Sequence, residues 1–85
     1  NAFVQIKGQF KNVETLGENK KRRLKATFFD STGQIECVWF KAIQFVKKQL
    51  KPNTEYILFG KPSIFNNKLN MTHPEFEETE IYLKR

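Results

Sequence analysis

Residues 20–40, KKRRLKATFFDSTGQIECVWF, are the most informative part of this chain of 85 residues. Apolar and polar side chains alternate on both sides of Asp30-Ser31-Thr32-Gly33, which has the composition of a tight turn with glycine where positive φ is tolerated. The alternation predicts a β-hairpin with strands at about 22–30 and 34–40. We expect the core-facing side chains to be Leu24, Ala26, Phe28, Ile35, Cys37 and Trp39. We expect the outward-facing ones to be Arg23, Lys25, Thr27, Phe29, Glu36, Val38 and Phe40.

The segment before this hairpin predicts one more strand and a loop. Residues 3–13 alternate at period two, and Gly8 lies in the middle, where a bulge or a bend is the usual reason for glycine. The apolar side chains expected on one face of this strand are Val4, Ile6 and Phe10. Residues 14–21 are mostly polar and contain Gly17, so they predict an exposed loop.

The segment after the hairpin changes period. Residues 41–50 carry a helical stripe of Ile43, Val46 and Leu50, which leaves Phe45 off the stripe, and Pro52-Asn53 ends the helix. Further strands are expected at 54–61 and 68–73, with a loop at 62–67 between them. Residues 75–80 then turn acidic.

The predicted order is three strands, a short helix and two strands. This is the pattern of the oligonucleotide/oligosaccharide-binding (OB) fold, a five-stranded Greek-key β-barrel with its helix between strands 3 and 4. The fold class is therefore all-β with one short helix. We expect the domain to occupy residues 1–77 and residues 78–85 to form a linker. The chain begins with Asn1 rather than Met, which suggests a fragment of a longer protein.

The charge of the chain favours a polyanionic partner. The net charge is +6 with a pI near 9.6, and the basic residues cluster in the loop before the second strand. In this fold, nucleic acid usually lies on the strand 2–3 face and on the loops joining strands 1–2 and 4–5. Cations there would contact phosphates, and exposed rings would stack on unpaired bases. The candidate binding residues are Lys20, Lys21, Arg22, Arg23, Lys25, Phe40, Lys41, Phe45, Lys61, Phe65 and Lys68.

Several short motifs resemble one helicase family. They are the run at residues 22–28, then Asp30, Gly33, Val38-Trp39-Phe40, Gly60-Lys61 and His73-Pro74-Glu75. Together they resemble the wedge domain of the RecG ATP-dependent DNA helicases over about residues 3–77. The resemblance implies a non-catalytic module that binds the branch point of forks and Holliday junctions and splits their arms.

The same resemblance implies the partners and the stacking rings. The partners would be branched or single-stranded DNA and the helicase motor domains of the same parent chain, which would use ATP and Mg. In that family, an aromatic residue matching Phe40 stacks on a base at the junction. A second aromatic usually follows four residues later, where this chain has Gln44, with Phe45 one position further. Phe45 is therefore the candidate for the second ring.

Two alternatives remain open from the residues alone. The first is a generic barrel that binds single-stranded DNA or RNA without a motor. The second is an inter-domain docking module whose exposed rings are buried by neighbouring domains.

Other features of the sequence bear on the class of protein. The sequence lacks a Gly-rich loop with Lys-Ser/Thr, so we expect no ATP hydrolysis and no cofactor in this fragment. Cys37 is expected to be a buried apolar residue, and His73, the only histidine, a structural residue at the end of the barrel. Asp30 suits the turn and Glu36 a cross-strand charge pair. We expect no metal site, no membrane span, a monomer and a cytoplasmic, nucleoid-associated location in bacteria.

Overall fold

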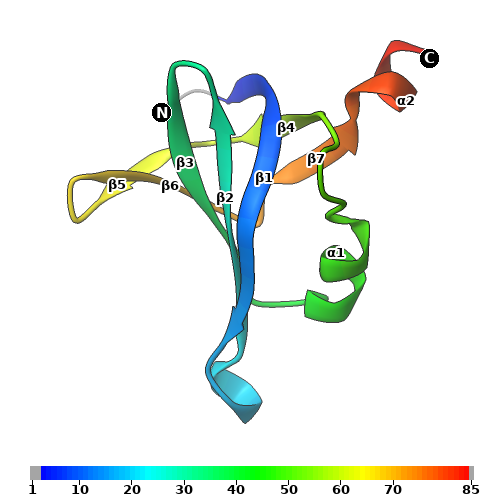
Figure 1. Cartoon of the computed structure of the whole chain (residues 1–85). Helices are drawn as coiled ribbons and strands as arrows, with labels where there is room; N and C mark the ends of the chain where they lie inside the picture. The colour runs from blue at the N-terminus through cyan, green and yellow to red at the C-terminus, as the bar shows by residue number, and fades with distance from the viewer. Residues whose placement is uncertain (1–2, 85) are drawn as a thin grey trace.

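The computed structural model describes residues 3–84, and Figure 1 shows the course of the chain. The described part forms one seven-stranded sheet, two short α-helices and one 3-10 helix. The strands are β1 (Val4–Leu16), β2 (Arg23–Asp30), β3 (Gly33–Trp39), β4 (Tyr56–Gly60), β5 (Ser63–Phe65), β6 (Lys68–Thr72) and β7 (Glu75–Glu78). The helices are η1 (Asn19–Lys21), α1 (Ile43–Gln49) and α2 (Thr79–Leu83).

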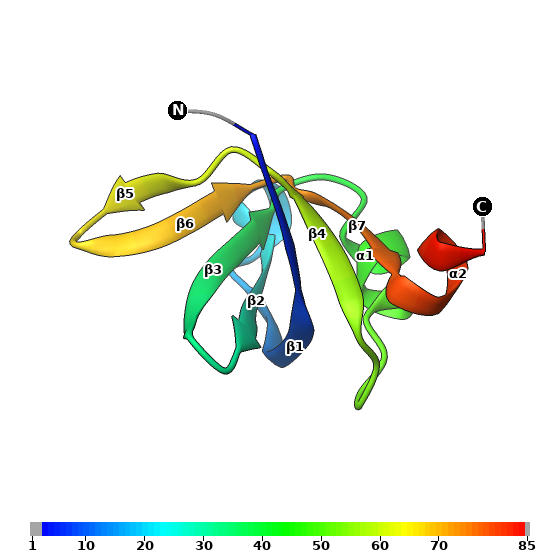
Figure 2. The same ribbon diagram turned by 90° about the horizontal axis from the view of Figure 1, so that it is seen from above.

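The strands are arranged as a barrel. Their order is β5-β6-β3-β2-β1-β4-β7, and all neighbours are antiparallel except β3 and β6, which run parallel. Strands β4 and β5 lie near opposite ends of this order, but only Lys61 and Pro62 separate them in the chain, so the sheet curves back towards itself. Helix α1 connects β3 to β4, as the sequence predicted. Figure 2 shows the strands splayed around a common centre, with the β5–β6 hairpin projecting on one side.

The long strand β1 belongs to both halves of this barrel. Its residues 4–8 pair with β4, and its residues 9–16 pair with β2. Gly8 lies where the partner changes. A Cβ there would collide with the carbonyl oxygen of Phe29 and would approach the ring of Phe28 to 3.0 Å. The expected bend therefore requires glycine for close approach, while the irregularity in the strand pairing lies further on, between Lys11 and Glu14.

The core is rich in aromatic rings. Phe10 contacts four of them, with centroid distances of 4.9 Å to Phe28, 5.3 Å to Tyr56, 5.5 Å to Phe76 and 6.2 Å to Trp39. The six side chains predicted to face inward from β2 and β3 are all buried. The helical stripe is also confirmed, because Val46 is buried and its two companions, Ile43 and Leu50, pack against the core.

The structure refines one prediction about the β2–β3 hairpin and overturns another. Thr27 faces outward as predicted, but it is buried, because it lies in register between Lys11 and Glu36, whose long side chains flank it on both neighbouring strands. Gly33 does not adopt positive φ. Instead, the carboxylate of Asp30 accepts hydrogen bonds from the backbone N–H groups of Thr32 (2.7 Å) and Gly33 (3.1 Å) and holds the turn.

Several predicted boundaries also differ from the structure. Strand β1 continues to Leu16, so the loop before β2 is shorter than residues 14–21, and β4 spans Tyr56–Gly60 rather than 54–61. The expected loop at 62–67 is wrong, because Ser63–Phe65 pairs with β6. Asn66 and Asn67 both have positive φ (54° and 63°), which is the geometry of a two-residue type I′ turn.

The end of the chain continues the fold beyond the expected boundary at residue 77. Glu75–Glu78 forms β7 on the free edge of β4, and Phe76 on this strand packs into the aromatic core. Thr79 at the start of α2 is buried, and its N–H donates to the carbonyl oxygen of Glu55. Residues 78–83 are thus part of β7 and α2. That residues 78–85 lead towards further domains stays a prediction.

Candidate nucleic-acid interface

The sheet has one polar side that is turned away from the core. Cross-strand register places Lys25 opposite Val38, Glu36 opposite Asn70, and Phe65 opposite Lys68. We call this side the outer face, formed by Arg23, Lys25, Thr27, Phe29, Gln34, Glu36, Val38, Phe65, Lys68, Asn70 and Thr72. The structure therefore brings five of the predicted binding residues onto one side of three neighbouring strands and β5: Arg23, Lys25, Phe65, Lys68 and, just beyond the end of β3, Phe40.

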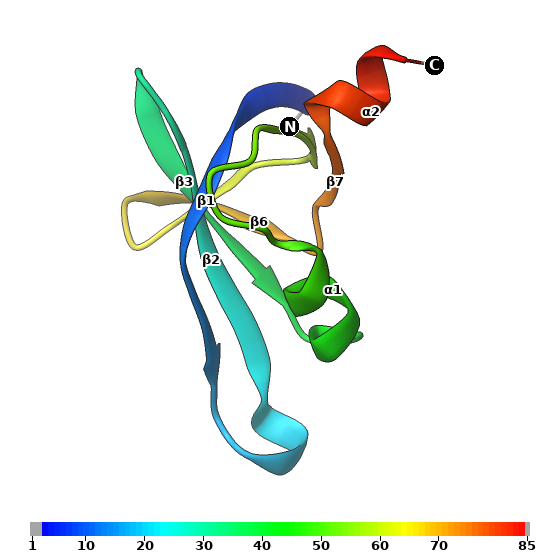
Figure 3. The same ribbon diagram turned by 45° about the vertical axis from the view of Figure 1, so that its right-hand side comes forward.

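The basic loop lies at the tip of the extended β1–β2 hairpin, which runs well past the barrel (Figure 3). Gly17 (φ 80°) and Asn19 (φ 53°) make the sharp turns that lead into and form η1. The side chains of Lys20, Lys21 and Arg22 are exposed. Among the described residues, none of these three cations forms an ion pair, so their charge is available to a polyanion.

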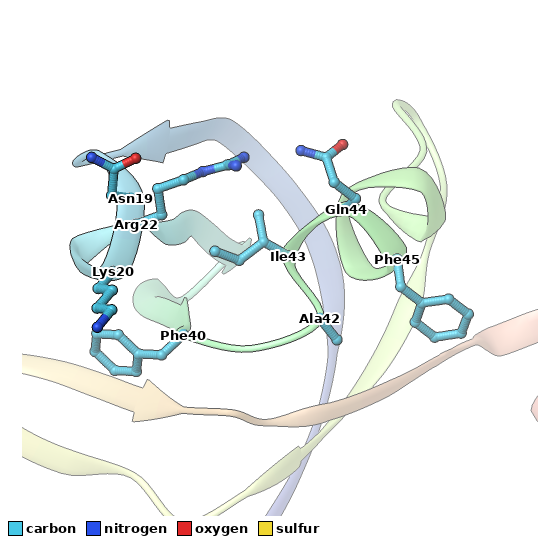
Figure 4. A pocket seen from close by; sticks show the side chains of 8 residues that line it. All are labelled: Asn19, Lys20, Arg22, Phe40, Ala42, Ile43, Gln44 and Phe45. Carbon is cyan, nitrogen blue, oxygen red and sulfur yellow. The ribbon is translucent and has the colours of Figure 1, made fainter.

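Phe40 shares a hollow with this loop. The hollow has a volume of about 490 Å³, and Figure 4 shows Lys20 and Arg22 on one side of it and Phe40 at its edge. The ring of Phe40 is 54% exposed. Its backbone N–H donates a 2.9 Å hydrogen bond to Nε2 of His73, and the two rings lie 6.1 Å apart. The prediction that His73 is structural is confirmed.

A family model described as "OB-fold nucleic acid binding domain" matches residues 4–79. The chain belongs to this OB-fold family. The predicted all-β fold class and nucleic-acid binding are therefore confirmed for this OB-fold domain. No curated protein matches the chain.

Phe45 lies at the other end of the hollow in the OB-fold domain. Phe45 is 65% exposed on α1, which confirms that it lies off the core stripe. In Figure 4 its ring points away from Phe40, with Ile43 and Ala42 between them. Lys41 is exposed in the bend before α1. Phe40 and Phe45 line one hollow, but they do not form a single ring platform.

In the β5–β6 hairpin of the OB-fold domain, Phe65 and Lys68 flank the two-residue turn. Phe65 is 68% exposed and forms the closing pair of the hairpin with Lys68. Lys61 lies before this hairpin, where its ammonium stands 5.4 Å from the ring centroid of Phe3. Phe65 and Lys68 extend the outer face onto the β5–β6 hairpin.

Two contacts on the outer face change the charge that it presents. Lys25 forms an ion pair with Glu36 (3.4 Å), so the predicted cross-strand pair of Glu36 is confirmed and part of the charge of Lys25 is neutralised. The ammonium of Lys11 lies 4.8 Å from the ring centroid of Phe29. Sequence reasoning missed Lys11, because alternation shows which side a residue faces but not its register against the next strand.

Two further features of residues 3–84 concern metal binding and the single thiol. This part of the chain contains no group of three or more His, Cys, Asp or Glu side chains that could hold a metal. Burial raises the pKa of the Cys37 thiol to about 12, with the charge of Glu36 as a smaller cause, so this thiol stays protonated at neutral pH. No helix within the same residues is long and apolar enough to cross a membrane.

Proposed function

We propose that this OB-fold domain binds single-stranded nucleic acid along its outer face and stacks one unpaired base on Phe40. The observation that carries this proposal is the exposed ring of Phe40 in the same hollow as the unpaired cations Lys20 and Arg22. A phosphate near these cations and a base on the ring would be neighbouring parts of one strand. Lys61 and Lys68 offer further phosphate contacts at the far end of the face.

Both kinds of contact have known strengths. Phosphate contacts supply affinity that falls with salt and depends little on sequence. Stacking on an aromatic ring contributes about 1–3 kcal/mol per base and tolerates every base. An OB fold occupies a site of about 4–16 nucleotides, so a strand of about ten nucleotides is a suitable ligand.

The test is fluorescence anisotropy with a labelled strand of about ten nucleotides, using wild type, Phe40→Ala and Phe45→Ala. We expect Phe40→Ala to raise Kd by roughly 5- to 150-fold, which corresponds to about 1–3 kcal/mol. Phe45→Ala tests the second candidate ring, which lines the same hollow but points away from Phe40. Leu83→Ala is the control, because it removes an exposed apolar side chain on α2 that does not line the hollow. Equal Kd values for wild type and Phe40→Ala would refute the stacking role.

A more specific function is also favoured by one observation. An exposed ring at the end of β3 stands where the resemblance to RecG wedge domains places the junction-stacking residue. In that case the domain would bind a replication fork or Holliday junction and split its arms within a bacterial cytoplasmic helicase, beside motor domains that use ATP and Mg. The domain itself would be a monomeric, non-catalytic module.

A second set of probes separates the two functions. A three-way fork, the matching duplex and the single strand would be compared at two salt concentrations. Preference for the fork, lost in Phe40→Ala, supports the wedge function. Equal affinity for fork and single strand supports the generic single-strand function. Weak binding to all three probes would instead support an inter-domain docking module, whose exposed rings contact protein.

A further inference from the structure

His73 connects the ends of β6 and β3 through both its backbone and its side chain. Its N–H donates a 2.8 Å hydrogen bond to the carbonyl oxygen of Val38. Its Nε2 accepts the 2.9 Å hydrogen bond from the backbone N–H of Phe40. The next residue continues this connection, because the carbonyl oxygen of Pro74 accepts a 3.3 Å hydrogen bond from Nε1 of Trp39. Phe40 is thus fixed immediately after the last residue of β3.

The backbone of His73 is strained to make this contact. Its φ is 51°, in the left-handed region that only a few per cent of non-glycine residues adopt, with asparagine, aspartate and histidine the most frequent among them. This conformation returns the imidazole towards β3. Burial of Phe40 does not explain the strain, because the ring is 54% exposed and lies outside the core cluster. Strained residues of this kind concentrate at functional sites, and here the strained residue holds an exposed ring.

We propose that His73 is the positioning residue for the stacking ring. It holds the backbone of Phe40 in place, so the ring is oriented before nucleic acid arrives and less conformational freedom is lost on binding. The bond requires an unprotonated Nε2, so the imidazole is neutral with its proton on Nδ1. This inference rests on the proposed function, because it assigns His73 to the same binding site.

Two substitutions separate the acceptor from the backbone conformation. In His73→Asn, the side-chain oxygen lies about where Nδ1 was, so the side chain is too short to reach the N–H of Phe40. Asparagine tolerates positive φ, so the backbone conformation is kept. In His73→Gln, the side-chain oxygen is at the distance of Nε2 and can accept the same bond. Binding of a labelled ten-nucleotide strand to the 85-residue chain is measured at several salt concentrations for both variants, for Phe40→Ala and for the double variant with His73→Asn.

We expect His73→Asn to weaken binding by about fivefold or more, the low end of one stacking contact, with an unchanged salt slope. His73→Gln should bind within about twofold of wild type, because the acceptor is restored. In the double variant, the loss should not exceed that of Phe40→Ala alone, since both changes remove the same contact. Long-range proton–nitrogen NMR spectra of wild type should show the proton of His73 on Nδ1.

The outcomes distinguish this inference from the proposed function. If Phe40→Ala weakens binding but His73→Asn does not, or if the two losses add, the positioning role is refuted while the stacking role stands. A reduced salt slope in His73→Asn would make His73 a phosphate contact and would also refute it. A proton on Nε2 in the NMR spectra refutes the bond without any ligand. If Phe40→Ala binds like wild type, the proposed function fails and this inference fails with it.

Discussion

The ammonium of Lys25 lies 3.4 Å from a carboxylate oxygen of Glu36 in the middle of the outer face. The two side chains project from neighbouring strands and are both about one-third exposed or less, at 34% and 26%. A carboxylate on a surface that binds phosphates lowers affinity, because it repels the backbone and neutralises a nearby cation. The pair therefore favours a path on which phosphates follow the basic loop and bases lie towards the strands.

Replacing Glu36 should strengthen binding. Glu36→Gln removes one negative charge from the outer face and releases Lys25 from its ion pair. We expect the Kd for a single strand to fall by about two- to fivefold at low salt, in line with about 1 kcal/mol for one charge at close range in water. Glu80→Gln is the matched control, since it releases Lys84 from a 3.6 Å ion pair on α2, away from this face. An equal gain in both variants would show a net-charge effect only.

The cations of the basic loop should set the salt dependence. Lys20→Gln with Arg22→Gln removes two exposed charges beside Phe40. We expect the slope of log K against log salt to become less negative by about 1.4, because each phosphate contact to a single strand contributes about 0.7. Titrations at several salt concentrations measure this slope. Lys47→Gln with Lys48→Gln on α1 removes the same charge elsewhere, and an equal change there would contradict a localised contact.

Gly8 should be required for stability. In Gly8→Ala the new methyl group would collide with the carbonyl oxygen of Phe29 and press on the ring of Phe28. We expect a loss of about 2–3 kcal/mol in the free energy of unfolding, measured by urea denaturation. Gly33→Ala is the control, because nothing lies within 4 Å of its Cβ position, so it should be neutral or stabilising by up to about 1 kcal/mol. Similar losses in both variants would contradict the close approach at Gly8.

Cys37 should make stability depend on alkaline pH. The folded thiol has its pKa raised from 9.0 to about 12, so above pH 9 the unfolded chain releases a proton that the folded chain keeps. The contribution of the protonated Cys37 thiol to the free energy of unfolding is complete below the pKa of the thiol in the unfolded chain. It is lost as pH rises towards the pKa of the thiol in the folded chain. At about pH 10 the loss is about 1.4 kcal/mol relative to neutral pH. Denaturation of wild type and Cys37→Ala at neutral pH and at about pH 10 isolates the loss of stability due to Cys37, since the other groups that titrate at alkaline pH are present in both proteins.

The inward faces of β2 and β3 were predictable because every second residue of each strand is apolar, although Phe29 and Val38 add apolar residues on the outward side. Strand β5 was missed because Pro62 and the two asparagines suggested a loop. The paired asparagines were nevertheless a usable signal, since both adopt the positive φ of a type I′ turn. Strand β7 was missed because its three glutamates suggested a linker. Phe76 shows that one aromatic residue packed against the core is enough to hold such a strand on the sheet.

The sequence predicted which residues belong to the site better than it predicted how they contact one another. The sequence identified the basic loop and Phe40, but not the hollow that they share. It also could not reveal that His73 holds Phe40, because the two residues are 33 positions apart and the bond depends on the parallel pairing of β3 with β6. The sequence predicted that Glu36 forms a cross-strand charge pair, but it did not identify Lys25 as the partner. Register between strands, which alternation does not provide, decides each of these contacts.

The connection between Phe40 and His73 gives the two parts of the interface different folding requirements. The basic loop joins strands that are adjacent in the sequence, so its charge gathers as soon as one local hairpin forms. The ring is fixed only when β6, much later in the chain, has docked beside β3. A loosened molecule in which β6 has detached would still attract any polyanion but would no longer hold a base. Mild heating or a destabilising substitution would therefore erase discrimination between ligands before it erased affinity.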